Sequence, residues 1–223
     1  MEYSEGAVRD NLRNREGRRV FYLGREDSLS REAENYLIRE GIQILPAEEA
    51  RPQRYRLENG GYLEEKPEEM THLNGEVLVP KTHPRILFRG EMDALEAQIM
   101  LCQLKLQGAR KELGELLTLC REILRCDVLD SPLPETTLCG LTSDEIRRRS
   151  HRPQDFYGQP HFMPQWTDGE EILELNRLRT QVRRTELAAF RAFGGKRGDL
   201  IQALNRMSSM VYLLMIRRKK AGR

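Results

Sequence analysis

The sequence has 223 residues, of which 39% are hydrophobic and 32% are charged, and its formal net charge is +2. This length allows one large domain, or one medium domain with a small appendage. So small a net charge argues against binding of nucleic acid through bulk electrostatics. The chain has no apolar run long enough to span a membrane, and no signal-peptide pattern near its N-terminus. We therefore expect a cytoplasmic protein with no nucleic-acid or membrane partner.

The N-terminal third predicts a small α/β region. Residues 1–16 are polar and charged, and we expect them to be loosely held. Arg19–Leu23 is typical of a short strand, a serine-capped helix follows and ends at Gly41, and Ile42–Leu45 is typical of a second strand. The segment lacks the glycine fingerprint of a dinucleotide-binding unit. Residues 46–70 are rich in proline, glycine and glutamate, and they predict a linker that could hold a small hairpin.

The rest of the chain predicts a helical bundle. Apolar residues recur every three or four positions in several segments, and Thr142 with Glu145 has the pattern of a capping box before a short helix. The expected helices start at about Glu91 and cover 108–126, 144–150, 169–193 and 199–216. We predict a mainly α fold, with a small α/β region at 1–70 and a bundle of about four to five helices at 71–223.

Four cysteines and a basic segment are expected to be structurally ordinary. Cys102, Cys120, Cys126 and Cys139 form no CxxC pair, so we expect buried structural thiols and no metal site. The four basic residues at 217–220 are expected to be solvated.

Two segments near the C-terminal end carry polar side chains at helical spacing. Arg179, Arg183 and Glu186 follow one another at i, i+4 and i+7, so they share one helix face. Two arginines in a fixed row suit a polyanion such as a triphosphate, and a solvated helix face is the alternative. Asn205 and Arg206 border an apolar stripe, where a polar group needs a partner. That partner could be a ligand or another helix.

Four segments resemble motifs of the ATP:corrinoid adenosyltransferases. They occur in the family's order and at compatible spacing, and they are VPKTHPRILFRGEMDAL (79–95), HFMP (161–164), LRTQVRRTE (178–186) and ALNRMSS (203–209). Three further segments resemble the ethanolamine-utilisation type more than the propanediol type. These are SLSREAENYLIREGIQI, EEMTHLNGEVLVPK and LRCDVLDSPLPETTLCGLTSDEIRRRSHRP.

This resemblance implies a PduO-like helical bundle that transfers the 5′-deoxyadenosyl group of ATP to cob(I)alamin, giving adenosylcobalamin and triphosphate. The reduced cobalt of cobalamin is the nucleophile, so no catalytic serine, cysteine or lysine is needed. Mg²⁺ would bridge phosphate oxygens without a full protein cage. The product would supply ethanolamine ammonia-lyase, in the cytoplasm or inside a bacterial microcompartment. Because the family's active sites lie between subunits, we expect a homo-oligomer, either a trimer or, alternatively, a dimer.

By the same resemblance, three residues take catalytic roles. Asp93 pairs with Arg179 at the wall where ATP and corrinoid meet, and Phe162 removes the lower axial ligand of cobalt. The alternatives are a structural salt bridge between helices for the pair and an ordinary core residue for Phe162. The neighbouring His161 is disfavoured as a cobalt ligand.

The resemblance assigns contacts with ATP to five residues. Arg183, Glu186 and Asn205 would contact the nucleotide, and Thr71 and Lys81 would contact its phosphates. For Lys81 the alternative is a solvated loop lysine, and for Asn205 it is a hydrogen bond between helices.

The chain departs from the family pattern in two places. The propanediol type has a glycine-rich phosphate loop, which is reduced here to Thr71–Gly75. The ethanolamine type carries a His…CCxxC metal motif, whereas no cysteine precedes Cys102 here, so we expect no protein-bound metal. The shortened loop motivates an alternative function, a non-catalytic corrinoid-binding or delivery protein that contacts the lyase or a microcompartment. A nucleic-acid-binding function is disfavoured because acidic residues are interleaved with the arginines.

Overall fold

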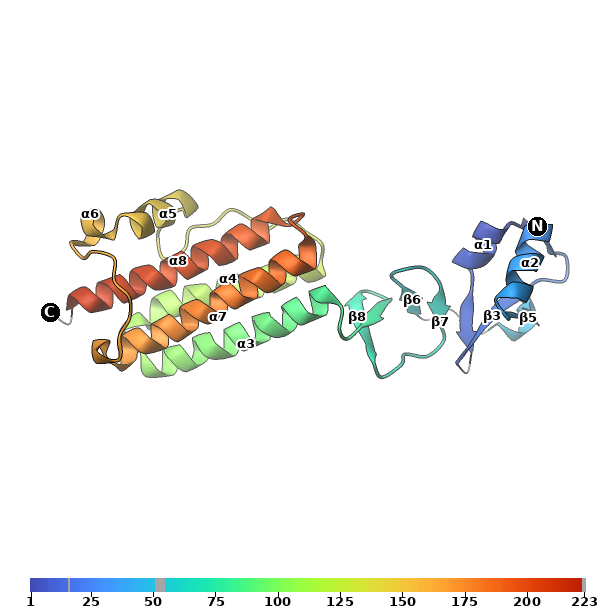
Figure 1. Cartoon of the computed structure of the whole chain (residues 1–223), viewed down its shortest axis with the longest axis horizontal. Coiled ribbons are helices and arrows are strands. Elements are labelled where there is room, and N and C mark those ends of the chain that lie inside the picture. The colour runs from blue at the N-terminus through green and yellow to red at the C-terminus, as the bar shows by residue number, and fades with distance from the viewer. Residues whose placement is uncertain (16, 51–54, 222–223) are drawn as a thin grey trace. The chain divides into compact units, whose positions relative to one another are not determined.

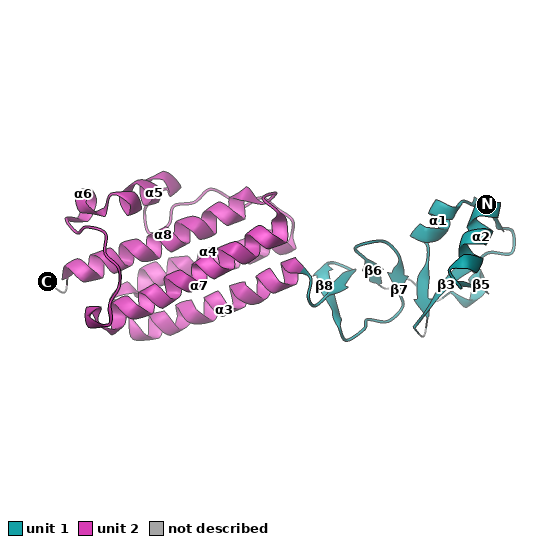
Figure 2. Cartoon of the chain, in the orientation of Figure 1, with its two compact units in different colours: residues 1–83 teal, residues 84–223 magenta. Residues whose placement is uncertain are grey.

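The computed structural model describes residues 1–15, 17–50 and 55–221. The chain forms two compact units, Met1–His83 and Pro84–Arg223 (Figure 2). The boundary that the sequence suggests after position 70 falls earlier than this division. The strands β8 (Met70–Asn74) and β9 (Val77–Pro80) lie beyond position 70, yet they belong to the sheet of the first unit.

The first unit is built on a mixed sheet whose described strands lie in the order β5–β3–β2–β7–β6–β9–β8. The remaining strands of this sheet are β2 (Arg13–Arg15), β3 (Arg18–Leu23), β5 (Gln43–Pro46), β6 (Tyr55–Leu57) and β7 (Tyr62–Leu63). β3 and β5 are parallel and are joined through α2 (Arg31–Arg39), which confirms the predicted strand–helix–strand segment. The prediction that 46–70 is a linker is wrong for the part that forms β6 and β7, because both strands belong to this sheet. The small hairpin that the sequence allowed there is present, since β6 and β7 pair antiparallel.

The N-terminal segment is held in place, so the prediction that residues 1–16 are loose is wrong. Ser4 caps α1 (Glu5–Asp10), and β1 (Glu2–Tyr3) pairs with β4 (Ser28–Leu29). Val8 of α1 is fully buried, and burial of such an apolar side chain holds the segment against α2. The core of this unit consists of Val8, Phe21, Ala33, Tyr36, Leu37 and Ile42. Residue 16 itself lies outside the described residues.

The second unit is a bundle in which four long helices lie side by side (Figure 1). The long helices are α3 (Pro84–Lys105), α4 (Arg110–Val128), α7 (Glu170–Phe193) and α8 (Gly198–Ala221). The short ones are α5 (Ser143–His151) and α6 (Pro153–Tyr157), and single 3₁₀ turns lie at Ala47–Glu49 in the first unit and at Gln107–Ala109 and Trp166–Asp168. The mainly α fold is confirmed, and so is the capping box at Thr142.

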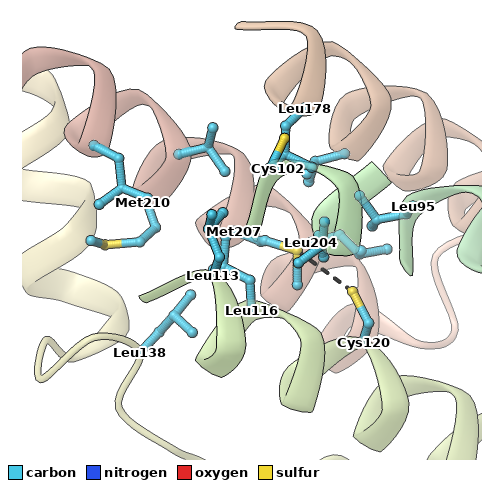
Figure 3. Packing of buried hydrophobic residues seen from close by; sticks show 14 of the residues in the cluster. Leu95, Cys102, Leu113, Leu116, Cys120, Leu138, Leu178, Leu204, Met207 and Met210 are labelled. Atoms are coloured by element: carbon cyan, nitrogen blue, oxygen red, sulfur yellow. Dashed lines mark hydrogen bonds between the residues drawn. The ribbon is translucent and has the colours of Figure 1, made fainter. Parts of the chain in front are cut away.

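The core of the bundle is apolar and rich in sulfur. Figure 3 shows side chains from all four long helices converging, with the Sγ of Cys120 lying 3.9 Å from the Sδ of Met207. Cys102, Cys120 and Cys126 are fully buried and Cys139 is half-buried, and all four cysteines are free. Burial raises the pKa of the Cys102, Cys120 and Cys139 thiols, in Cys139 to about 12. These three thiols therefore have little thiolate character, and burial of the cysteines agrees with the predicted structural role.

A buried ion cluster connects the start of α3 to the end of α4. Asp127 has no exposed surface, and its Oδ1 accepts from the Nε of Arg85 at 2.9 Å. Its Oδ2 accepts from the Nε of Arg89 at 2.6 Å. A proline suits the first position of a helix, and α3 begins at Pro84 rather than at Glu91 as predicted, so that its first two turns carry both arginines.

The basic C-terminal segment is not merely solvated, which corrects the expectation for 217–220. Arg217 lies 3.8 Å from Glu112, Arg218 lies 3.5 Å from Glu171, and Lys219 binds Asp168. These contacts join the last turns of α8 to α4, to α7 and to the turn before α7. The segment therefore contributes to the bundle, which explains why α8 continues beyond the predicted end at 216.

The start of α8 holds the long connection after α4. Asp199 accepts from the Leu133 amide at 2.9 Å and from Nε and Nη2 of Arg197. The side chain of Arg197 also donates to the carbonyl oxygen of Ser131 at 2.8 Å. Arg197 and Asp199 thus form a polar anchor for the segment that leads towards α5.

This anchor predicts a pH-dependent contribution to stability. Arg197 lowers the pKa of the Asp199 carboxyl from its ordinary 3.8 to about 2. A depressed carboxyl stabilises the folded state above its unfolded pKa and loses this contribution as the pH falls through its folded pKa. We expect Asp199→Asn to lower the free energy of unfolding by about 1–2 kcal/mol at neutral pH, a value discounted for partial exposure. The difference from wild type should fade between about pH 4 and pH 2.

Urea unfolding followed by far-ultraviolet circular dichroism measures this difference at each pH. In an Arg197→Met variant, the free energy of unfolding should also lose the pH dependence that Asp199 contributes, because the variant removes the main cause of the depressed pKa. A stability difference that stays constant from neutral pH to pH 2 would contradict the prediction.

Candidate functional site

A row of polar side chains follows one face of α7 and continues on α8, which packs against it. Arg179 and Glu186 are half-buried and Arg183 is exposed. The Nδ2 of Asn205 donates to the Oε1 of Glu186 at 2.9 Å, and the Nη1 of Arg206 donates to the Oδ1 of Asn205 at 2.7 Å. Both ends of the Asn205 amide therefore have a partner, and its orientation is set. The structure thus joins Glu186, Asn205 and Arg206, three residues that the sequence singles out.

The two arginines of this row form a site of positive charge. Burial lowers the pKa of Arg179, and the nearby charge of Arg183 lowers it further. Within the described residues, Arg179 bonds through its side chain only to the Oδ1 of Asn176, at 3.3 and 3.4 Å, and the Arg183 side chain forms no hydrogen bond or ion pair. By contrast, the adjacent Arg184 binds Glu91 of α3 at 2.8 and 3.0 Å. A half-buried arginine beside a second cation favours an anion from outside the chain.

Asp93 lies on α3 and is exposed. In the described part of the chain it forms no hydrogen bond or ion pair with Arg179, whose side chain bonds to Asn176 instead. Asp93 shares a face of α3 with Met100 and Leu104 by i, i+7 and i+11 spacing. The expected pair is therefore not formed within one chain.

An exposed apolar face surrounds these charged residues on α3 and α7. The exposed fractions reach 70% for Leu104, 62% for Leu187 and 59% for Phe190. The other large apolar residues exposed on the two helices are Leu87, Met100, Leu101 and Leu173. Leu187 and Phe190 follow Arg183 at i+4 and i+7, so cationic and apolar groups share one face of α7. Exposed apolar surface of this kind is typical of a face that another molecule covers.

Phe162 lies in the irregular segment between α6 and α7, and this segment is attached to α8. The Phe162 amide donates to the hydroxyl of Tyr212 at 3.4 Å, and the two rings stack with centroids 6.3 Å apart. The Nζ of Lys219 lies 5.5 Å from the centroid of the Phe162 ring. In the same segment Met163 and Trp166 are 86% and 84% exposed. Phe162 is thus a half-buried member of an apolar surface and not a deep core residue.

His161 is engaged through both ring nitrogens. Its Nδ1 lies 3.0 Å from the Tyr212 hydroxyl, and its Nε2 lies 3.2 Å from the carbonyl oxygen of His151. Each ring nitrogen of His161 thus has a hydrogen-bond partner within the chain in this arrangement.

Thr71 and Lys81 lie in the first unit, on and next to the β8–β9 hairpin. Thr71 is paired with Val79 in the sheet, and Lys81 binds the carboxylate of Glu68 at 3.0 Å. The segment 71–75 is a strand and its turn, with Gly75 at φ +47°, rather than an open glycine-rich loop. The structure therefore groups these two residues with each other and leaves their role towards phosphate as a prediction.

A cavity of about 630 Å³ lies on the other side of Arg206. It is lined by the segment 133–138, the first residues of α5, and residues of α8 that include Gln202 and Arg206. The Nε of Arg206 donates to the Oγ of Ser143 at 3.1 Å, so one side chain contacts both this cavity and Asn205. Arg206 is therefore the boundary between the cavity and the polar row.

Two site residues were missed by the sequence reading. Tyr212 follows Asn205 by seven positions, so helical spacing could have placed it on the same face of α8. Ser143 gave no comparable signal, because its contact with Arg206 joins positions 63 residues apart.

The described residues offer neither a metal-binding cluster nor a membrane-spanning helix. Among the described side chains, no group of three His, Cys, Asp or Glu residues could hold a metal ion. None of the helices in the described ranges has the length and apolarity needed to cross a membrane.

Known proteins similar to this chain have a common description. The sequence profile of the cobalamin adenosyltransferase family matches residues 61–218. The chain is 37% identical over 157 residues to the corrinoid adenosyltransferase EutT of Salmonella typhimurium, and 36% identical to EutT of Escherichia coli. Each match covers 68% of this chain and 59% of the relative, so the chain spans less than two thirds of these curated relatives.

A solved structure has a similar fold. It is a variant of a PduO-type ATP:corrinoid adenosyltransferase from Lactobacillus reuteri, complexed with cobalamin and ATP. The TM-score is 0.54 at 16% sequence identity, and the match covers 67% of this chain and 87% of that one. At this identity the similarity concerns the fold.

Proposed function

Because the chain belongs to the cobalamin adenosyltransferase family, we propose that it transfers the 5′-deoxyadenosyl group of ATP to cob(I)alamin. Two kinds of comparison support this activity. Relatives at 36–37% identity are named corrinoid adenosyltransferases, and the similar solved structure is complexed with cobalamin and ATP. The same comparisons favour the enzyme over a non-catalytic corrinoid-delivery protein.

The proposed reaction needs few reactive groups from the protein. The electron pair of Co(I) forms the bond to C5′ of ATP, and the C5′–O bond breaks with its electron pair leaving on triphosphate. An external donor must first supply one electron, which reduces Co(II) to Co(I). The protein therefore has to hold ATP with C5′ facing cobalt and to stabilise the negative charge of the leaving triphosphate.

The observation that carries the proposal is the polar row of α7 and α8. Arg179 and Arg183 provide positive charge, and the Glu186–Asn205 hydrogen bond fixes polar groups beside them. This combination suits a nucleotide, since the arginines match phosphate and the carboxylate and amide match sugar or base. Thr71 and Lys81 would contribute further phosphate contacts. Mg²⁺ would be held by phosphate oxygens, because the described residues offer no acidic cage for it.

Corrinoid would be covered by the apolar surface around Phe162. Phe162 would take the place of the lower axial ligand, which makes Co(II) easier to reduce, and the exposed Met163 and Trp166 offer further apolar area beside it. The name of the relatives supports an ethanolamine-utilisation role, in which the product supplies ethanolamine ammonia-lyase, with a bacterial microcompartment as one setting.

The active site would be completed by a second copy of this chain. Asp93 and Arg179 make no ion pair with each other in the described part of one chain, and each lies on a helix with exposed apolar neighbours. Burial of the apolar face between copies would bring an Asp93 to the Arg179 of a neighbour. A trimer, or alternatively a dimer, would allow this arrangement.

ATP binding tests the proposal through two adjacent arginines. We expect Arg183→Ala to weaken ATP binding about 10- to 100-fold, the loss typical of a charged hydrogen bond. Arg184→Ala is the matched control, because Arg184 is committed to Glu91 and should change binding less than about twofold. Isothermal titration with and without cobalamin measures both. An absence of ATP binding to the wild-type protein under both conditions would overturn the enzyme function.

A further inference from the structure

The hydroxyl of Tyr212 lies at the centre of a hydrogen-bond chain that holds the segment carrying Phe162. His161 and Phe162 precede α7, whereas Tyr212 lies in α8, 50 residues from Phe162. The Tyr212 hydroxyl is a hydrogen-bond partner of both the His161 ring and the Phe162 amide. One oxygen atom thus connects two consecutive residues of this segment to the helix that also carries Asn205.

The direction of each hydrogen bond follows from the chemistry of the groups. The carbonyl oxygen of His151 can only accept, so the Nε2 of neutral His161 carries the proton and donates to it. The Nδ1 then lacks a proton and accepts from the Tyr212 hydroxyl. The amide of Phe162 can only donate, and it uses a lone pair of the same hydroxyl oxygen. Donors and acceptors are thus aligned along the whole chain, which strengthens each bond.

Ring packing adds a second constraint on the same residues. The His161 and Tyr212 rings stack with an interplanar angle of 11°, and the Phe162 and Tyr212 rings stack at 26°. The segment is fixed further along as well, where Lys219 binds Asp168. Between that contact and the buried Gln159, Tyr212 bonds to both His161 and Phe162, and Lys219 lies over the Phe162 ring.

We propose that Tyr212 is a positioning residue for the corrinoid reaction, because it holds the Phe162 ring at the place where the lower axial ligand must be excluded. This inference rests on the proposed function and concerns a residue that would act through Phe162. Loss of the hydroxyl leaves the tyrosine ring in place but removes the partner of the Phe162 amide. The ring of Phe162 should then vary in position, and the lower ligand should return to cobalt in part of the molecules.

Tyr212→Phe tests the proposal with two corrinoids. We expect the adenosylation rate with complete cobalamin to fall about 5- to 10-fold, as for the loss of a hydrogen-bonded hydroxyl. The rate with a corrinoid that lacks the lower base should change less than about twofold, because there is no ligand to exclude. Equal losses on both substrates would overturn the proposal. If Tyr212→Phe does not fold, His161→Phe keeps a stacked ring but removes the acceptor, and it should show the same selectivity.

Tyr157→Phe is the matched control. Tyr157 lies in α6, and its hydroxyl is buried without a hydrogen-bond partner among the described groups. The same chemical change at this site should leave the ratio of the two rates unchanged. In a Phe162→Ala background, Tyr212→Phe should cause little further loss, because the two residues would act as one unit. A full additional loss in that background would show that Tyr212 does not act through Phe162.

Electron paramagnetic resonance separates failure of this inference from failure of the proposed function. With ATP and cob(II)alamin bound, the wild-type spectrum should lack the nitrogen splitting of the lower base, and Tyr212→Phe should recover it in part. If the wild-type protein binds neither substrate, the proposed function fails. If wild type and Tyr212→Phe both lose the splitting completely, the proposed function stands and the role of Tyr212 is refuted.

Discussion

Two inactive variants should restore each other's activity. We expect Asp93→Ala and Arg179→Ala to abolish adenosylation separately without unfolding the protein, since both side chains lie outside the core. If the pair forms between copies, a mixed oligomer contains sites with Asp93 from one chain and Arg179 from the other. At equal ratio, random assembly makes about a quarter of the sites fully wild type. Co-expression with two affinity tags, followed by an assay of adenosylcobalamin formation, measures the recovery.

The control for this experiment is a mixed oligomer in which no chain carries Asp93. An Asp93→Ala chain mixed with an Asp93→Ala/Arg179→Ala chain offers no Asp93 and should stay inactive. Mixed oligomers without recovery of activity would place the pair within one chain, against the contacts seen here. Retained turnover in both single variants would show that neither residue is needed at the meeting surface of ATP and corrinoid.

The largest effect on stability is expected at the buried ion cluster. Asp127→Ala removes a carboxylate with no exposed surface and leaves Arg85 and Arg89 without that shared anion. Breaking a buried ion pair from one side typically costs about 3–5 kcal/mol, which is a large part of the stability of a domain. We expect a loss of this size in the free energy of unfolding, measured by urea titration of the helical circular dichroism signal.

An exposed pair between the same two helices serves as the comparison. Arg121 of α4 lies 3.3 Å from Glu96 of α3, and its side chain is 64% exposed. Arg121→Ala should therefore cost at most about 1 kcal/mol. If both variants lost similar stability, the buried cluster would have no special role in joining α3 to α4.

The helices were predictable because their signal is local. Apolar spacing and the Thr142 capping box act within a few residues, and the structure confirms α5, α7 and α2 close to their expected bounds. The features that were predicted wrongly depend on residues far away in the sequence. α3 starts at Pro84 with two arginines whose carboxylate lies about forty residues further on, and the basic end of α8 finds its acids on other elements.

The candidate site also has one part that local spacing predicts and another part that depends on distant contacts. Arg179, Arg183 and Glu186 could be placed on one face from spacing, and Asn205 joins them through the Glu186 contact. The pairing of Asp93 with Arg179 could not be tested by spacing, because we propose that it forms between two copies of the chain. The link between Phe162 and Tyr212 joins two elements whose sequences contain no sign of each other. Local periodicity therefore reveals the polar row of α7, whereas the contacts of the segment around Phe162 depend on the tertiary fold.

The four free thiols have a consequence for chemistry under reducing conditions. Formation of Co(I) requires a donor strong enough to cleave many protein disulfides, and this fold contains no such bond to lose. Cys102, Cys120 and Cys126 are fully buried and Cys139 is half-buried, which limits the access of these thiols to the activated carbon of a nucleotide in the proposed reaction. In the proposed reaction, the protein would therefore surround a strong reductant without offering it a disulfide to reduce.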